Sequence, residues 1–440
     1  MAETGILIEH LFRHQAGRIV AHLTRALGPS SLDLAEDMVQ GALLRALETW
    51  PYQGVPENPA GWLFQVARNA ALDHLRHQKM AGHKASQLEA AWGRSYSNPV
   101  PILDGSPQSD DELRLIFMCC HPAIPIEARV ALSLKTVGGF SVGEIAGAFL
   151  AEETAIAQRL VRAKRQIRAE GLSMEMPRGG DLAMRLEPVL EVIYLLFNES
   201  YVAHQGEHLI RQDLCAEALR LGQLLASSTI ATPAVHALMA VMALLAARLP
   251  ARTNEAGDLI LLEDQDRSKW DRQLLALGFR HFDLSMAGGE LTRYHVEAAI
   301  AATHARARGL SETDWPMILD LYGQLMALNG SPVVRLNRAV AMGKVHGPEL
   351  ALAALEGLKD DPKMRNYYLF LAVRGHLLLQ LGLKAEAADC FTAALERPCS
   401  EPERRFLRRK LAEISLITDE EFIQARANGE QDIPINLGRG

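Results

Sequence analysis

The stretch SVGEIAGAFLAEETAIAQRLVRAKRQI, from Ser141 to Ile167, decides how this part of the chain folds. Ser141 and Glu144 have the spacing of a capping box, which predicts the start of a helix. After a short break at residues 151–153, a second helix carries apolar residues at i, i+4, i+7 and i+11, which are Ile156, Leu160, Ala163 and Ile167. Two short helices joined by a tight turn, the second of them amphipathic, predict a helix-turn-helix.

The second of these helices concentrates positive charge in a chain whose formal net charge is −7 at pH 7. Residues Arg159 to Arg168 include five cations and no carboxylate, and the cations lie off the apolar stripe. Such a helix often only faces water, but the capped helix before it favours DNA binding, with early residues meeting base edges and later cations meeting phosphates. Local charge matters more here than total charge, because binding releases the counterions that phosphates hold.

The composition of the 440-residue chain favours an all-α protein. Ala and Leu are abundant and aromatic residues make up only 6% of the chain, which favours helices over sheets. The longest apolar run, Ala237 to Ala247, is about half of what a membrane-spanning helix needs. The N-terminus lacks the residue order of a signal peptide. We therefore expect a cytoplasmic protein that does not contact a membrane.

The sequence gives no indication of an enzyme or of a cofactor. It has no phosphate-binding Gly-rich loop and no nucleophile motif. The five cysteines have no framework spacing, so we expect reduced thiols. Cys119, Cys120 and His121 are adjacent, but no second ligand pair stands at metal-binding spacing, which favours a core role over a metal site. We therefore expect no catalytic residues, no cofactor and no metal.

A second group of residues that suit nucleic-acid chemistry lies nearer the N-terminus. WPYQGVPENPAG, Trp50 to Gly61, is a loop rich in Pro and Gly, and a helix with basic residues follows it as far as Lys79. Aromatic side chains beside a basic helix suit single-stranded bases, which stack on them or are held in a pocket. Such aromatics can instead anchor the core, and we expect this for Trp50 and Trp62.

Breaks in the helical pattern divide the chain. Residues 82–109 are rich in Pro, Gly, Ser and Asp and predict a linker. Residues 338–358 and 377–397 share a layout of two helices at an offset of roughly 36 to 39 residues, which is near the tetratricopeptide period. An irregular α-helical bundle is the alternative. Residues 251–271 interrupt the helices and are expected to form a loop or a β-like excursion, either solvated or engaged in binding.

Two motifs, in this order, resemble the extracytoplasmic-function (ECF) class of bacterial RNA polymerase sigma factors. AEDMVQGALLRAL (Ala35 to Leu47) and NPAGWLFQVARNAALDHLR (Asn58 to Arg76) are similar to region 2 of that class, and the stretch from Ser141 is similar to region 4. The resemblance covers residues 7–172, and the remaining chain looks like the tetratricopeptide-type extension of one ECF subgroup. It implies an all-α fold with a region 2 helical bundle at 1–80, a linker at 81–109, a region 4 helix-turn-helix at 110–175 and a TPR-like helical extension at 182–440.

The resemblance also implies a role for particular residues. Three residues would lie on the helix that docks on core RNA polymerase, namely Asp37, Met38 and Gln40. Residues that would capture or hold the −10 element of promoter DNA are Tyr52, Asn58, Arg68, Asn69, Asp73 and Arg76. The loop at residues 52–58 would hold a flipped base. Residues that would read the −35 element as a duplex are Gln158, Arg159, Arg162 and Arg165.

The sequence departs from the ECF pattern at four places. Gly41 stands where an acid is usual, and Leu150 stands at a turn position that is usually Gly. Ala155 and Ala157 stand where Thr and a basic residue are common. These differences predict a changed polymerase contact, a wider turn and a −35 readout that differs from the usual one.

Two other classes of protein compete with a sigma factor. One is a helix-turn-helix regulator with a helical sensor domain, which binds duplex DNA without core polymerase and has no use for residues 35–76. The other is a solenoid scaffold whose basic helix only faces water, and it would show no salt-dependent DNA binding. In the sigma factor interpretation, the extension holds a partner or regulates the sigma regions through an intramolecular contact.

Overall fold

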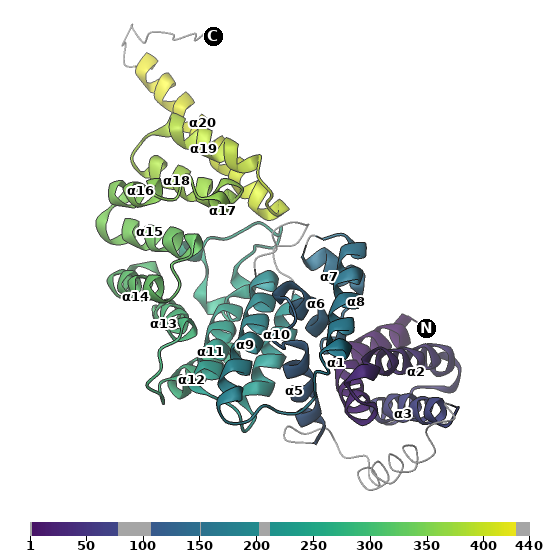
Figure 1. Ribbon diagram of the computed structural model, residues 1–440. Coiled ribbons are helices and arrows are strands. Elements are labelled where there is room, and N and C mark those ends of the chain that lie inside the picture. The colour runs from purple at the N-terminus through teal and green to yellow at the C-terminus, as the bar shows by residue number, and fades with distance from the viewer. Residues whose placement is uncertain (1, 78–106, 150, 202–211, 428–440) are drawn as a thin grey trace. The chain divides into compact units, whose positions relative to one another are not determined.

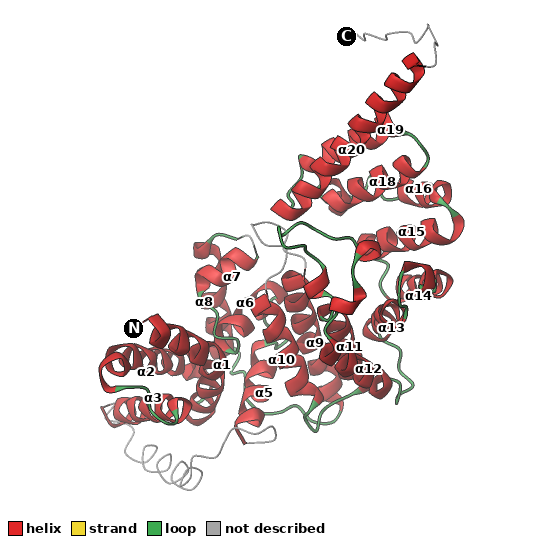
Figure 2. Cartoon of the chain, turned by 180° about the vertical axis from the view of Figure 1, so that it is seen from behind, coloured by secondary structure: helices red, strands yellow, loops and turns green. Residues whose placement is uncertain are grey.

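The computed structural model describes residues 2–77, 107–149, 151–201 and 212–427. Within these ranges every regular element is a helix, apart from one isolated antiparallel bridge between Thr253 and Leu259 (Figure 2). The prediction of an all-α fold is therefore confirmed. Residues 82–106 of the predicted linker lie outside the described residues, as does Leu150.

The chain forms two compact units. The first contains Met1–Ser200 and Gln212–Val235, and the second contains Tyr201–Arg211 and His236–Gly440. The segments predicted as regions 2 and 4 both fall in the first unit, together with the first two helices of the predicted extension. The units therefore do not follow the boundary that the sequence suggests near residue 182.

The first unit begins with a bundle of three helices, α1 (Ala2–Leu27), α2 (Leu32–Gln53) and α3 (Pro59–His77), each of which packs on the other two (Figure 1). Buried residues recur along α2 at the spacing of one helix face, from Ala35 to Trp50. Trp50 is buried and meets Trp62 of α3 edge-on, with ring centroids 5.3 Å apart. Trp50 is the core anchor that the sequence predicts, while Trp62 is partly buried against it.

The remaining helices of the first unit are α5 (Pro107–Cys119), α6 (Ile126–Thr136), α7 (Val142–Ala148), α8 (Glu153–Ala169), α9 (Gly180–Tyr201) and α10 (Gln212–Ala226). The helix α8 packs on α6 and α7, while α1 packs on α5 and α6. The helix α5 starts inside the predicted linker, at Pro107. Proline favours the first position of a helix as well as loops, so the last three linker residues are helical.

The second unit is a succession of helices, most of which pack on their neighbours in sequence (Figure 1). These helices are α11 (Pro233–Ala246, which begins in the first unit), α12 (Arg272–Ser285), α13 (Arg293–Arg306), α14 (Trp315–Leu328), α15 (Pro332–His346), α16 (Pro348–Glu356), α17 (Pro362–Arg365), α18 (Tyr368–Gln380), α19 (Lys384–Leu395) and α20 (Glu401–Ala427). The pairs α15–α16 and α18–α19 start 36 residues apart, at 332 and 368. This spacing is the one that the repeated layout predicts.

A small residue allows close packing within the second of these pairs. A Cβ atom on Gly375 of α18 would lie 3.1 Å from the ring of Phe391 in α19. Phe391 itself is fully buried. Neighbouring helices of this kind bury the face that neither can bury alone.

The loop between α11 and α12 is the β-like excursion expected at residues 251–271. It contains the isolated bridge and the short 3₁₀ turns Leu249–Ala251, Leu262–Asp264 and Arg267–Lys269. Before it, residues Pro233–Ala251 are long and apolar enough to cross a membrane by composition, but 67% of that window is buried inside the protein. A buried core helix explains the apolar composition.

Candidate nucleic-acid interface

The helix-turn-helix segment has the local structure that its sequence predicts. Ser141 Oγ accepts a hydrogen bond from the Glu144 N–H at 3.1 Å, and the Ser141 N–H donates to Glu144 Oε2 at 2.8 Å. These two bonds complete the capping box at the start of α7. The predicted stripe of α8 is buried, and its members are Ile156, Leu160, Ala163 and Ile167. Burial of this stripe fixes which side chains α8 presents outward.

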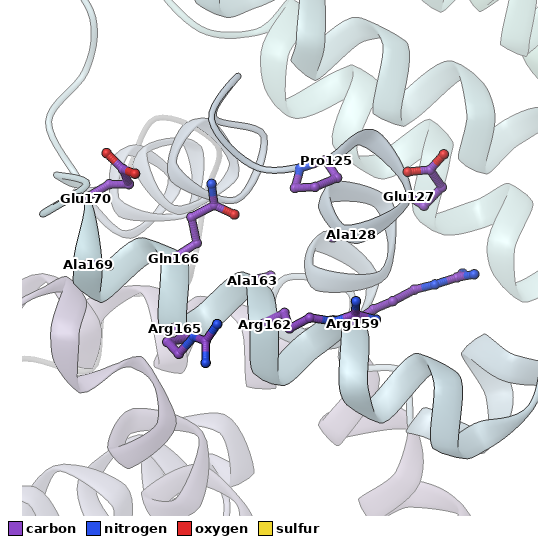
Figure 3. A pocket seen from close by; sticks show the side chains of 10 residues that line it. All are labelled: Pro125, Glu127, Ala128, Arg159, Arg162, Ala163, Arg165, Gln166, Ala169 and Glu170. Carbon is purple, nitrogen blue, oxygen red and sulfur yellow. The ribbon is translucent and has the colours of Figure 1, made fainter.

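The outward side of α8 carries the residues predicted to read duplex DNA. Gln158, Arg162 and Arg165 are exposed, and Arg159 is partly buried. The three arginines line an open cavity of about 570 Å³ between α8 and the start of α6 at Pro125 (Figure 3). The fold therefore brings the predicted −35 residues together on one surface.

Two of the five cations of α8 have a different role, which the sequence alone does not reveal. Lys164 Nζ lies 2.8 Å from Asp33 Oδ1 and 2.7 Å from Glu36 Oε2, both on α2. Arg168 Nη1 lies 2.6 Å from Asp33 Oδ2. Glu36 is buried and also accepts a hydrogen bond from Thr136 Oγ1 at 2.8 Å. We call these five residues the α2–α8 ion cluster.

The charges within this cluster stabilise one another. Burial on its own lowers the pKa of Lys164, but the Glu36 and Asp33 carboxylates outweigh it and raise that pKa above its usual value. Burial likewise raises the pKa of Asp33, and its hydrogen bonds with Lys164 and Arg168 bring the pKa below the usual value. The side chain of Lys164 is only 13% exposed, so it is not presented to solvent as a DNA contact.

A second set of ion pairs joins α1 to α5 and α10. Buried Asp111 accepts from Arg25 and lies 3.0 Å from His22 Nδ1. Buried Glu112 lies 3.5 Å from Arg18 Nε and 2.7 Å from Arg220 Nη2 of α10. A buried carboxylate that lost these partners would be left uncompensated, so the pairs hold the predicted region 4 against the predicted region 2.

Gly17 of α1 marks a close approach between these two regions. A Cβ atom at this position would lie 2.0 Å from the carbonyl oxygen of Val137, which follows α6. Only a residue without a side chain fits there. The two predicted regions are therefore in direct backbone contact as well as ion-paired.

The predicted −10 residues lie on α3 and on the loop before it. Asn69 and Asp73 of α3 are exposed, while Arg68 is partly buried. Arg76 belongs to α3, but its side chain lies outside the described residues. These four positions are spread along the second half of α3, from residue 68 to residue 76.

The loop that precedes α3 differs from the predicted span of residues 52–58. The helix α2 continues to Gln53, so Tyr52 is helical, and its side chain is 84% exposed. Asn58 caps α3, because its Oδ1 accepts from the Gly61 N–H at 2.9 Å. One of the predicted base contacts therefore has a structural role in starting α3, whereas Tyr52 is available to a ligand.

The exposed face of α2 carries the predicted polymerase contacts. Asp37 and Gln40 are exposed and Met38 is partly buried. Leu44 and Leu47 continue this face and are 61% and 47% exposed. These exposed leucines at helical spacing give α2 an apolar surface beside its charged one, and the spacing is visible in the sequence.

No group of three metal-ligating side chains occurs among the residues that the structure describes. All five cysteines are unpaired, and four of them, including Cys119 and Cys120, are buried. Burial, together with the nearby Cys120, raises the pKa of Cys119 well above its usual value. The adjacent His121 uses Nδ1 to accept from the Ala123 N–H at 3.1 Å.

Comparison with protein families gives the class of the N-terminal part. Residues 11–80 match sigma-70 region 2, and residues 185–286 match a family of unknown function. The first match covers most of the bundle of α1, α2 and α3, so this N-terminal bundle is similar to sigma-70 region 2. Sigma-70 factors are transcription initiation factors and not enzymes, so this similarity indicates no catalytic family.

Two relatives extend the comparison. An uncharacterized protein of Rhizobium meliloti (strain 1021) is 41% identical over 396 residues, which cover 89% of this chain and 93% of that protein. The chain belongs to the same family as this Rhizobium protein. The RNA polymerase sigma factor CarQ of Myxococcus xanthus is 29% identical over 137 residues, or 31% of this chain and 73% of CarQ. No solved structure matches the chain.

Proposed function

We propose that this protein is an RNA polymerase sigma factor of the ECF type that directs promoter-specific initiation of transcription in the cytoplasm. The observation that carries the proposal is a sigma-70 region 2 domain in one compact unit with a capped, basic helix pair. The likeness to the sigma factor CarQ supports the same function. Core RNA polymerase and promoter DNA are the partners that this function requires.

The predicted regions 2 and 4 of the first unit have different functions in this proposal. The exposed face of α2, from Asp37 to Leu47, docks on core polymerase. Tyr52 and the exposed side chains of α3 hold the melted −10 strand, because an unstacked base gains energy from stacking on an aromatic ring. Capturing an extruded base offsets part of the cost of melting the duplex.

Duplex recognition belongs to α8 in this proposal. Gln158 and Arg162 lie nearest its exposed leading end and suit base edges, whereas Arg165 suits a phosphate. Ala155 and Ala157 leave that leading end with few side chains that can specify a base. The −35 sequence read by this protein therefore differs from that read by a sigma factor with longer side chains there.

We also propose that the arrangement of the first unit is a closed, resting state. The α2–α8 ion cluster withholds two of the five cations of α8 from DNA. Arg220 of α10 holds Glu112, and Arg185 of α9 donates to the Phe117 carbonyl at 2.8 Å. Both arginines belong to the predicted extension, so its first helices are placed to regulate the sigma regions in cis.

A pull-down of core polymerase tests the docking role of α2. Asp37→Arg and Gln40→Ala are expected to reduce recovery of core polymerase, because both residues are exposed on the docking face. Asp320→Arg is the matched control, since Asp320 is an exposed acid on α14 of the second unit. Recovery that is equal for all three variants and the wild type would support a DNA-binding regulator that does not use polymerase.

A further inference from the structure

The second unit has a half-open cavity of about 270 Å³, lined by residues of α14, α15, α18, α19, α20 and the loop of residues 251–271. Most of its wall is apolar, with contributions from Trp315, Val340, Val373, Leu377, Phe391 and Phe406. Cavities with an apolar wall and a few placed polar groups are the usual sites of small ligands. None of the residues in this cavity belongs to the proposed nucleic-acid interface.

The polar groups of this cavity include two lysines and a histidine whose pKa is lowered by burial. Lys344, His376 and Lys410 line it together with one carboxylate, that of Glu263 in the loop. Glu263 Oε2 lies 2.8 Å from Lys344 Nζ. Burial raises the pKa of Glu263, but the hydrogen bond from Lys344 and the charges of Lys344, His376 and Lys410 outweigh it and lower that pKa. The site is therefore built to hold a negative charge.

The loop presents a short apolar and acidic segment to this site. Leu261, Leu262 and Glu263 all line the cavity and are partly buried. The loop is fastened on either side of them, by Asp258 to Arg405 at 2.6 Å and by Arg267 to the carbonyls of His304 and Ala307. Two leucines followed by a carboxylate combine apolar groups with one acid group, as an amphipathic acid does. The chain's own loop therefore places such a combination of groups against the cavity.

We propose that this cavity binds a small amphipathic carboxylate, whose acid group replaces Glu263 on Lys344 and whose apolar body lies along Val373 and Phe406. A cation does not suit the site, because the carboxylate that lines it, that of Glu263, is already paired with Lys344. The other lining lysine, Lys410, is paired with Glu413 outside the lining. A peptide does not suit it either, since buried backbone groups need hydrogen-bond partners that the apolar wall lacks. The proposal concerns binding alone and does not rest on the proposed sigma function.

The volume of the cavity limits the size of the ligand. About 270 Å³ corresponds to on the order of nine groups the size of a water molecule. A straight chain of about that many carbons fits, and decanoate is therefore the probe. Decanol has the same apolar body without the charge, and decyltrimethylammonium has the opposite charge.

Calorimetric titration of the full chain with decanoate, below its micelle concentration, tests the proposal. We expect saturable binding of decanoate, binding of decanol at least tenfold weaker, and none of decyltrimethylammonium. Lys344→Met keeps an unbranched side chain one atom shorter and removes its charge, so decanoate affinity should fall at least tenfold. Glu263→Gln removes the competing carboxylate, so affinity should rise several-fold.

Decanoate affinity is expected to fall in Lys344→Met and to rise in Glu263→Gln. A loss of folding would instead weaken decanoate binding in both variants. Asp264→Asn is the matched control, because Asp264 is the exposed acid beside Glu263 and does not line the cavity. Decanoate affinity should be unchanged in this variant. Absence of binding in both the wild type and Glu263→Gln would overturn the proposal, as would equal affinity for decanol and decanoate.

Discussion

Replacing Gly17 with alanine should open the closed arrangement of the first unit. The added Cβ would lie 2.0 Å from the Val137 carbonyl oxygen, a separation that real Cβ atoms do not show. The two segments must therefore move apart by about 1 Å, and overpacking of this kind costs about 1–3 kcal/mol. The cost disappears once α1 and the end of α6 separate, so it falls on the closed form alone.

This free-energy cost of the closed form determines how far the ratio of open to closed molecules changes. Because 1.4 kcal/mol is a factor of ten, the ratio of open to closed molecules rises by roughly 5- to 140-fold in the variant. Opening releases Lys164 and Arg168 from Asp33 and Glu36. If both then meet phosphates, the dependence of log affinity on log salt steepens by about 1.8, from two contacts at about 0.9 each.

The assay measures binding to a promoter duplex over a range of salt concentrations, and transcription with core polymerase. Asp33→Asn is a second variant, which favours opening by weakening the α2–α8 ion cluster without a steric clash, and it should change both readouts in the same direction. Gly323→Ala is the control, since Gly323 is an exposed glycine of α14 with nothing near its added Cβ. An unchanged salt slope and unchanged transcription in folded Gly17→Ala and Asp33→Asn would refute the reasoning.

Four further predictions follow from the structure. Lys164 and Arg168 hold the pKa of Asp33 below its usual value. The Asp33 carboxylate therefore stabilises the closed form at any pH above the usual pKa, and this stability is lost as the pH falls through the lowered pKa. The loss should be measured as faster hydrogen exchange in α8. Tyr52→Ala should abolish promoter melting, monitored by permanganate reactivity, and leave duplex binding intact, while Tyr52→Phe retains melting. Arg162→Ala should cost about 1–3 kcal/mol in promoter affinity and relax sequence preference, whereas Arg165→Ala should reduce the salt slope by about 1. Phe391→Ala should cost about 3–5 kcal/mol in the unfolding free energy of the second unit, measured by calorimetry, because its buried ring packs on Gly375.

Local features of the fold follow from the sequence because they depend on residues close together in the chain. The capping box of Ser141 and Glu144, the buried stripe of α8 and the repeat of helix pairs in the second unit all depend on spacings within one or two helices. The core position of Trp50 follows from the sequence for a similar reason, since Trp50 and Trp62 flank one loop. Periodicity and caps are sufficient for such features.

Features that depend on distant residues could not be predicted in this way. Arg168 and Asp33 are 135 residues apart, and no local pattern distinguishes an arginine that meets DNA from one that meets a carboxylate. The same limit applies to Gly17, which reads as an ordinary helix residue until Val137 is seen beside it. Asn58 and Pro107 were assigned to loops because both residues favour turns, yet each of them starts a helix.

Promoter-dependent transcription by the purified chain with core polymerase tests the central claim most directly. We expect a transcript from the protein's own promoter that requires the chain, that is lost with Asp37→Arg, and that persists with Asp320→Arg. A chain that binds the promoter duplex but neither associates with core polymerase nor yields a transcript would contradict the account.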